Sequence, residues 1–490
     1  MDNESIMPES PAPEGSLRAL WKRLKYRSVY ECGTLRYSYV GITMLFFWLV
    51  FGALCFSLMQ LLSPQLLPIA LKNLSGSSQL IGLLCVSIPG LINAIVTPIV
   101  SYRSDRTRTR WGRRIPYMLF ATPPTVAFLL LIGWAPSLGG VLHRLLPGIS
   151  ETSLGLGILC VAVVGFQFFN MFAGSIFYYI FADVVPEKLM GRFMALFGMT
   201  NTAAGYIFMT FFFVYHTSGM VWLYTGFGLL YLVGFSLMSL MVKEGSYPPP
   251  VMDEYRKSWT GSVRVFFKES FTIPYYVFFF LGTSLSTAST LCRNLFNFFF
   301  ANENLGLSSA EYGYIMGVGL LLTFFLKIPL GYAVDRFRPI RVYLFGMILV
   351  VLTNIFSIVV FRNMPDIFAL LERLAPGMVP DGRIGYVLFF IVTQLLSIVY
   401  AIQFVAELPM FAALLPHERY GQFSSAQAMF RAVIVMICGW GGGIFIESMG
   451  NDYLNLYVWD VIFTVLSFFC MLYVYHKWKQ YGGNRNYTAP

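Results

Sequence analysis

Residues 105–117 read Asp-Arg-Thr-Arg-Thr-Arg-Trp-Gly-Arg-Arg-Ile-Pro-Tyr, a densely basic stretch between two long apolar runs. The runs on either side, 80–102 and 116–134, are each long enough to cross the roughly 30 Å of hydrocarbon in a bilayer. Lys and Arg accumulate in the short cytoplasmic loops of membrane proteins. The stretch therefore predicts a helical membrane protein with this loop on the cytoplasmic side.

The composition of the whole chain agrees with a membrane protein. Hydrophobic residues make up 57% of the 490 residues and charged residues 12%, whereas globular chains carry about 25% charged residues. The polar, proline-containing residues 1–15 predict no cleavable signal peptide. The seven cysteines show no paired spacing, which favours small core residues over disulfides or metal ligands.

Apolar runs recur along the chain and predict an all-α integral membrane fold, with twelve transmembrane helices in two six-helix bundles. The predicted spans are 40–62, 80–102, 116–134, 154–181, 191–215, 221–242, 274–300, 312–334, 342–360, 384–415, 424–446 and 454–476. We expect five parts: a cytoplasmic segment 1–39, an N-terminal bundle 40–242, a linker 243–273, a C-terminal bundle 274–476 and a tail 477–490. Within the first segment, residues 17–25 carry apolar and basic side chains at helical spacing. They fit an amphipathic helix on the membrane surface or a solvated basic segment.

The distribution of positive charge predicts the orientation. If both termini are cytoplasmic, only five of the 34 Lys and Arg residues lie in outer loops. They are Lys72, Arg144, Arg362, Arg373 and Arg383. The net charge of +10 therefore reflects topology rather than nucleic-acid binding. We expect a multi-pass, monomeric protein of the cell membrane.

The basic stretch has a weaker echo in the second half of the chain, Gly-Tyr-Ala-Val-Asp-Arg-Phe-Arg at 331–338. Recurrence at the same place in both halves indicates an internal repeat. An Asp at a helix end can accept hydrogen bonds from a neighbouring helix N-terminus, and the arginines can bridge to acids on adjacent helices. We expect these residues to form a cytoplasmic gate that holds the two bundles together in one state. The alternative is a loop that is basic only because cytoplasmic loops are rich in Lys and Arg. The gate residues are Asp105, Arg106, Arg113, Asp335 and Arg336.

Two six-helix halves with this loop resemble the major facilitator superfamily. The long form 105–117 is similar to the glycoside–pentoside–hexuronide:cation symporters (melibiose-carrier-like) and to sucrose transporters. The resemblance implies a secondary transporter that works by alternating access, although that neighbourhood also contains a lysolipid carrier. Melibiose-type carriers place two acids on the second helix, at positions that fall on Asn93 and Thr97 here. Since neither is acidic, the cation site of these carriers is not reproduced.

Ionisable groups inside spans usually mark a pathway or a partner. Glu407 stands out as the one carboxylate well inside a predicted span, and Arg431 lies at a matching depth of the next span. We expect a Glu407–Arg431 pair that serves coupling, with a purely structural ion pair as the alternative. The resemblance implies that Arg431 stands for a lysine of melibiose-type carriers.

Lys327 lies eight residues before Asp335, as Thr97 lies eight before Asp105. By the repeat, the ammonium group of Lys327 is a fixed (resident) cation at the depth where melibiose-type carriers bind a mobile cation. The alternative is a lysine that snorkels to the inner surface.

Amides and charged side chains within the spans are the residue types that bind sugar hydroxyls. We expect the substrate site to contain Gln167, Asn170, Asn201, Arg293, Asn297 and Gln403.

The sequence thus predicts a secondary active transporter, proton-coupled, of a sugar, glycoside or similar polar solute, with no cofactor and no metal. One alternative is a carrier of an amphipathic cargo such as a lysolipid or drug. Another is a non-transporting sensor or a membrane enzyme. The four histidines lie outside the predicted spans or at their ends, and no HExxH, GxSxG or P-loop motif occurs, which argues against an enzyme.

Overall fold

The structure is a computed structural model that describes residues 30–217, 219–246, 270–374, 377, 380, 382–416, 419–483 and 487–490. The side chains at 98, 101, 102, 105, 106 and 421 are not part of this description. The expected amphipathic helix at 17–25 and most of the predicted linker, 247–269, lie outside the described residues, so both stay predictions.

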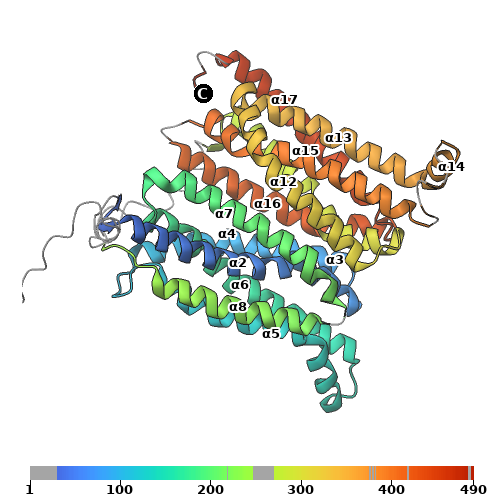
Figure 1. Ribbon diagram of the computed structural model, residues 1–490, viewed down its shortest axis with the longest axis horizontal. Helices are drawn as coiled ribbons and strands as arrows, with labels where there is room; N and C mark the ends of the chain where they lie inside the picture. The colour runs from blue at the N-terminus through green and yellow to red at the C-terminus, as the bar shows by residue number, and fades with distance from the viewer. Residues whose placement is uncertain are drawn as a thin grey trace, which may run out of the picture.

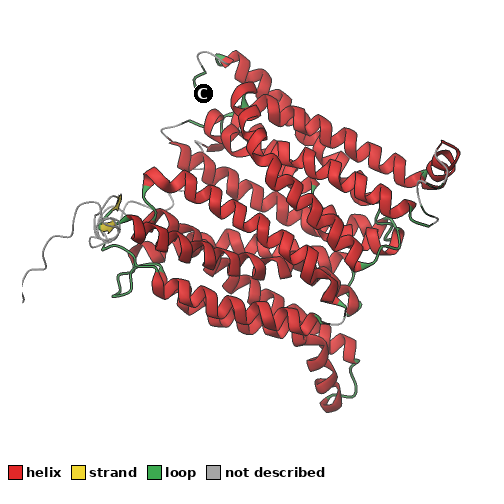
Figure 2. Cartoon of the chain, viewed as in Figure 1, coloured by secondary structure: helices red, strands yellow, loops and turns green. Residues whose placement is uncertain are grey.

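Long apolar helices build the described chain, as predicted (Figure 2). Eleven of the described helices are long and apolar enough to cross a membrane. The first six spans are α2 (Tyr39–Asn73), α3–η1–α4 (Ser78–Gly82, Leu83–Ser87, Ile88–Arg106), α5 (Ile115–Leu145), α6 (Glu151–Val184), α7–η2–η3 (Glu187–Ile207, Phe208–Phe212, Phe213–His216) and α8 (Met220–Met241). Five more are α12 (Ser309–Phe337), α13 (Pro339–Arg362), α15 (Ile384–Leu414), α16 (Tyr420–Ser448) and α17 (Asn455–Gln480). Most extend beyond the predicted spans at one or both ends.

The remaining predicted span, 274–300, is present but interrupted. It consists of α10 (Pro274–Ser289), α11 (Leu291–Phe299) and η5 (Phe300–Asn304), with a break at Thr290. The hydroxyls of Ser289 and Thr290 donate to the carbonyl oxygens of Ser286 and Thr287. Such local bonds compete with the helical hydrogen bonds of the backbone.

The spans form two halves. In the first half α5 packs against α6 and α8, and in the second half α10 packs against α17 and α13 against α15 (Figure 1). An unpredicted hairpin, β1 (Tyr30–Cys32) and β2 (Leu35–Tyr37), lies at the same end of the bundle as the C-terminus. We call this end, which also carries the loop 107–114, the basic end, and the opposite end the far end. A further short helix, α14 (Met364–Leu374), lies at the far end.

The two halves are in close contact at the far end. There α16 packs on α3 and η1, while α12 packs on α7 and η2. A Cβ atom on Gly443 would lie 2.3 Å from the carbonyl oxygen of Ser78, so glycine permits the close approach of α16 to α3. The Ser78 hydroxyl donates to Asn451 at 2.8 Å across the same contact.

A lysine also joins the halves there. Lys72, at the end of α2, pairs with Glu303 and donates to the Tyr453 hydroxyl at 2.7 Å. Its ammonium lies 4.4 and 4.7 Å from the ring centroids of Phe299 and Tyr453. Cation–π contacts of a part-exposed lysine are worth about 0.5–1 kcal/mol. The far end is therefore closed by both packing and charge.

Gly443→Ala should favour conformations in which the far end is separated, because the added methyl group meets backbone that cannot move aside. Overpacking costs about 1–3 kcal/mol, which corresponds to a population shift of about 5- to 150-fold. The readout is the rate at which a short bifunctional thiol reagent joins cysteines placed at Ser78 and Asn451 in a cysteine-free background. That rate should fall several-fold. Gly331→Ala, where an added Cβ meets nothing within 4 Å, is the matched control; equal rates in both variants would contradict the packing account.

Candidate functional site

A cavity of about 780 Å³ with several polar groups in its wall lies against the first half of the bundle. Its wall includes one face of α2, formed by Ser57, Gln60 and Ser63, together with amides of α6 and α7. These groups bond to one another: Gln60 exchanges hydrogen bonds with Asn170 (2.9 and 3.3 Å), Gln167 donates to Ser63 (3.0 Å), and Ser57 donates to Asn201 (2.5 Å). The predicted substrate residues Gln167, Asn170 and Asn201 thus share one wall.

A second cavity of about 550 Å³ lies against the other half. It is lined by Arg293, Asn297 and Lys327 among others, and it shares Pro64 and Asn294 with the first cavity. The two cavities therefore adjoin between the halves. Five of the six predicted substrate residues line this combined space.

Gln403 is the exception. Its amide is buried between α15 and α10 and donates to Ser286, and its backbone packs against Gly346. It thus takes part in packing within the second half and lines neither of these two cavities.

The second cavity is backed by a buried carboxylate that sequence reasoning missed. Asp460 of α17 is 0% exposed, and Arg293 Nε lies 3.5 Å from its Oδ2 atom. The Tyr400 hydroxyl donates to the same oxygen at 2.6 Å, and the Arg293 guanidinium lies 4.0 Å from the centroid of the Tyr400 ring. The expectation that Glu407 is the one carboxylate well inside a span is therefore wrong. Asp460 lies only six residues into its predicted span. Because span ends predicted from sequence are uncertain by several residues, an acid at this position is interpreted as a residue of the membrane surface.

Lys327 faces the cavity and contacts the opposite half. Its ammonium donates to the Thr202 hydroxyl of α7 at 2.8 Å and lies 5.7 Å from the Phe404 ring centroid. The side chain is half-buried. This placement favours the resident-cation interpretation over a lysine that snorkels to the surface.

The predicted Glu407–Arg431 pair is present, with Arg431 Nη2 donating to Glu407 Oε1 at 2.6 Å between α15 and α16. Both side chains are part-exposed, at 24% and 30%. The pair lies within the second half and lines neither of the two cavities.

The positions where melibiose-type carriers place acids hold neutral groups that bond to each other. The Thr97 hydroxyl donates to Asn93 Oδ1 at 2.5 Å and lies 3.1 Å from the Ser175 hydroxyl. Asn93 lines the first cavity. The pair offers neutral oxygens and no negative charge.

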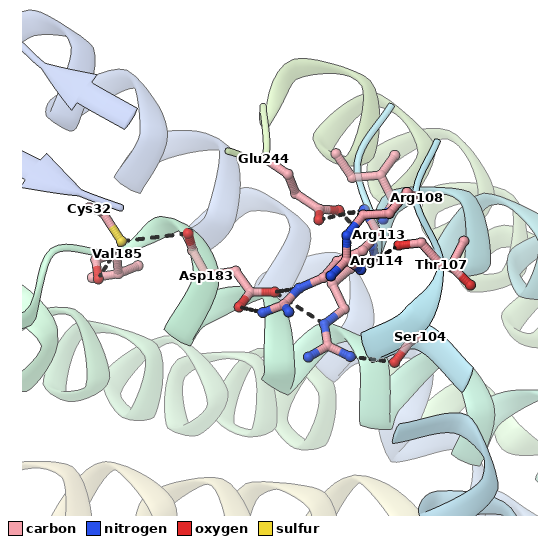
Figure 3. A network of polar contacts seen from close by, with 10 residues as sticks. Cys32, Ser104, Thr107, Arg108, Arg113, Arg114, Asp183, Val185 and Glu244 are labelled. Atoms are coloured by element: carbon pink, nitrogen blue, oxygen red, sulfur yellow. Dashed lines mark hydrogen bonds and ion pairs between the residues drawn. The ribbon is translucent and has the colours of Figure 1, made fainter. Parts of the chain in front are cut away.

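The basic end of the first half is fastened by a charged network (Figure 3). Arg113 and Arg114 both bind Asp183, at the end of α6, with their Nε atoms 3.0 and 3.1 Å from Oδ2. Arg114 also donates to Ser104 of α4. Bidentate pairing of arginine with a carboxylate combines strength with fixed geometry.

Glu244, just after α8, caps the start of α5. Its carboxylate accepts from the backbone N–H groups of residues 113, 114 and 115 at 2.8, 2.8 and 2.7 Å, where the helix dipole favours a negative charge. Gly112 adopts φ +108°, and a Cβ atom there would lie 2.6 Å from Glu244. Glycine at position 112 is thus required locally for this cap.

The hairpin joins the same network. The Cys32 thiol donates to the carbonyl oxygens of Asp183 and Val185 at 3.5 and 3.6 Å. Burial raises the pKa of the Cys32 thiol, and the charges of Asp183 and Glu187 raise it further. The thiol therefore stays protonated at neutral pH.

The network contains one residue of the expected gate. Arg113 bridges to an acid on an adjacent helix end, as expected of these arginines, and this acid, Asp183, belongs to the first half. The part of Arg113 in a gate between the halves stays a prediction. Asp335 and Arg336 are exposed at the end of α12. The side chains of Asp105 and Arg106 lie outside the described ones, so their gate role stays a prediction.

Comparison with known proteins identifies the family. The description "MFS/sugar transport protein" matches residues 49–451, most of the chain. The chain belongs to this family. Membership makes it a membrane transporter of sugar-like solutes and confirms the resemblance inferred from the loop 105–117. A comparison with curated proteins finds no match.

Several solved structures have the same fold as this chain. The nucleoside transporter NupG is 14% identical, with a TM-score of 0.59 over 88% of this chain and 98% of that chain. A D-xylose-proton symporter is 12% identical, with a TM-score of 0.61 over 89% and 97%. The xylose transporter XylE from E. coli, in an inward-open conformation, is 14% identical, with a TM-score of 0.59 over 88% and 95%. At these identities the likeness concerns the fold alone.

Asp460→Asn should destabilise the protein strongly, because it leaves the Arg293 guanidinium buried without a counter-charge. Breaking a buried pair from one side costs about 3–5 kcal/mol. Arg293→Gln combined with Asp460→Asn should recover much of that loss. Thermal unfolding in detergent measures both, and additive losses in the double variant would show that the two side chains do not act as a pair.

Proposed function

We propose that this protein carries a sugar-like polar solute across the cell membrane through the cavity between its two halves, by alternating access. The observation that carries the proposal is the polar wall of that cavity, where hydroxyl and amide groups converge around Asn170 and Asn294. Each such group can exchange its internal partner for a substrate hydroxyl at little net cost.

The closed far end supports a conformation that binds substrate from the basic end. We propose that the basic end is cytoplasmic, that both termini lie there, and that the protein acts as a monomer. The placement of Lys and Arg supports this orientation. A solute leaving toward the far end requires the contacts around Gly443 and Lys72 to separate.

We propose that a proton drives the cycle through the Glu407–Arg431 pair. A carboxylate that loses its guanidinium partner when helices move becomes a far better proton acceptor. The pair joins two different helices and is part-exposed, so separation and protonation are both feasible. A dehydrated Na⁺ needs several oxygen ligands and normally at least one carboxylate. Asn93 and Thr97 supply neutral oxygens and no negative charge.

Purified protein in liposomes should accumulate at least one labelled sugar when a proton gradient is imposed in Na⁺-free medium. Glu407→Gln should abolish gradient-driven accumulation, because an amide cannot take up the proton. It should leave exchange of labelled for unlabelled sugar across the membrane intact, since exchange needs no net proton movement.

The conservative change Glu407→Asp, which keeps the carboxylate, is the matched control and should retain part of the accumulation. Accumulation by Glu407→Gln at the wild-type level would rule out the coupling role. A large stimulation by Na⁺ at constant proton gradient would rule out the proton as the coupling ion. The absence of uptake for every sugar would overturn the transport proposal itself.

A further inference from the structure

An apolar groove of about 510 Å³ lies between α4 and α6, next to the start of α5. Its residues line neither of the two cavities between the halves. Val96 and Val100, at 6% and 2% exposed, form its floor, whereas Ile99 and Phe120 at its rim are 52% and 69% exposed. Because exposed apolar side chains of a membrane span face acyl chains, the groove opens to the bilayer rather than to the substrate pathway.

The groove runs along one face of α4. Ile95, Ile99 and Arg103 follow one another at four-residue spacing, so they lie one above the other. At a rise of about 1.5 Å per residue this stripe is about 12 Å long, which is most of one leaflet's half of the roughly 30 Å of hydrocarbon. Arg103 lies in the last turn of α4, at the basic end. The groove therefore extends from the basic end toward the middle of the bilayer.

The mouth of the groove at the basic end is cationic and polar. Arg103 is exposed, its guanidinium makes no hydrogen bond or ion pair with a described side chain, and no described residue of the groove wall is acidic. Arg108 donates to the carbonyl oxygen of Thr107 at 2.9 Å, which places a second exposed guanidinium beside the mouth. The hydroxyls of Thr107 and Tyr117 lie 2.6 Å apart, and the Tyr117 ring stacks on Phe172. A phosphate at this mouth would meet both positive charge and hydroxyl groups.

These properties together select one kind of occupant. A sugar would leave its hydroxyls without partners against isoleucine and phenylalanine side chains. A neutral or zwitterionic lipid would fill the apolar part but bring no net charge to Arg103. Anionic phospholipids are enriched in the cytoplasmic leaflet and are attracted by basic side chains close to it.

We propose that the groove binds one anionic phospholipid of the cytoplasmic leaflet, with an acyl chain along Ile95 and Ile99 and its phosphate at Arg103. The inference goes beyond the proposed transport function and takes from it only the orientation of the basic end. Since α4, α5 and α6 all line the groove, the bound lipid joins three helices of the first half. It should therefore stabilise that half against unfolding.

The test titrates the purified protein in detergent with phosphatidylglycerol or with phosphatidylcholine that carries the same two acyl chains. Native mass spectrometry counts the bound lipids, and thermal unfolding measures their effect on stability. One phosphatidylglycerol should bind about fivefold more tightly than phosphatidylcholine, as expected for one basic side chain near an anionic headgroup. It should also raise the unfolding temperature more.

Arg103→Gln should remove most of this preference, and Arg103→Lys, which keeps the charge, should retain it. Arg341→Gln removes the same charge from an exposed position at the basic end of α13, outside the groove, and is the matched control. Unfolding without added lipid shows whether each variant is folded.

The acyl-chain part of the site has its own pair of variants. Ile99→Trp should fill the groove and abolish the tight phosphatidylglycerol site even though Arg103 is present. Leu352→Trp adds the same side chain at a 57% exposed position of α13, outside the groove, and should leave the site intact.

Equal binding of the two lipids by the wild type would show ordinary bilayer contact only and would overturn the inference. Equal losses in Arg103→Gln and Arg341→Gln, or a preference that survives Ile99→Trp, would overturn it as well. None of these outcomes bears on sugar transport, because the binding assay contains no sugar and no gradient.

Discussion

The hydrocarbon of a bilayer offers no water to a polar group, so every polar side chain within a span must find a partner or face a cavity. The Arg293–Asp460 pair shows what this constraint does to the fold. An acid at 0% exposure is tolerated because Arg293 and the Tyr400 hydroxyl both face it. Removal of either charge would expose the other to the same penalty. Other polar residues of the spans line the cavities between the two halves, and some, such as Gln403, are paired within one half.

Specific polar contacts also hold the ends of the bundle together. At the basic end, Asp183 and Glu244 hold the loop 107–114 against α6 and α8, so the helices of the first half are fastened to one another. At the far end the halves meet through glycine-permitted backbone contacts and the Lys72 cluster. The charged network at the basic end lies within the first half, whereas the contacts between the halves at the far end combine close packing with the Lys72–Glu303 pair.

Much of this architecture could be predicted from sequence, because span length and hydrophobicity are local properties. All twelve predicted spans are present, and the Glu407–Arg431 pair followed from helical spacing. The break at Thr290 was not predicted, since it depends on which carbonyl oxygens the hydroxyls choose in three dimensions. Asp460 was missed because a single acid near an uncertain span end resembles a surface residue. Arg113 bridges to an acid on an adjacent helix end, as expected, but the sequence did not tell that this acid is Asp183 of the same half, because nearness in space depends on how the helices pack.

The account depends most on one claim, that the sugar binds in the space where the two cavities meet at Asn294. A cysteine placed at Asn294 in a cysteine-free background, reacted with a small thiol reagent, tests it directly. The account predicts that a transported sugar slows the labelling in a concentration-dependent way, with half-protection near its KM, while a cysteine at exposed Lys188 is labelled at the same rate throughout. Labelling at position 294 that no transported sugar changes would contradict the claim.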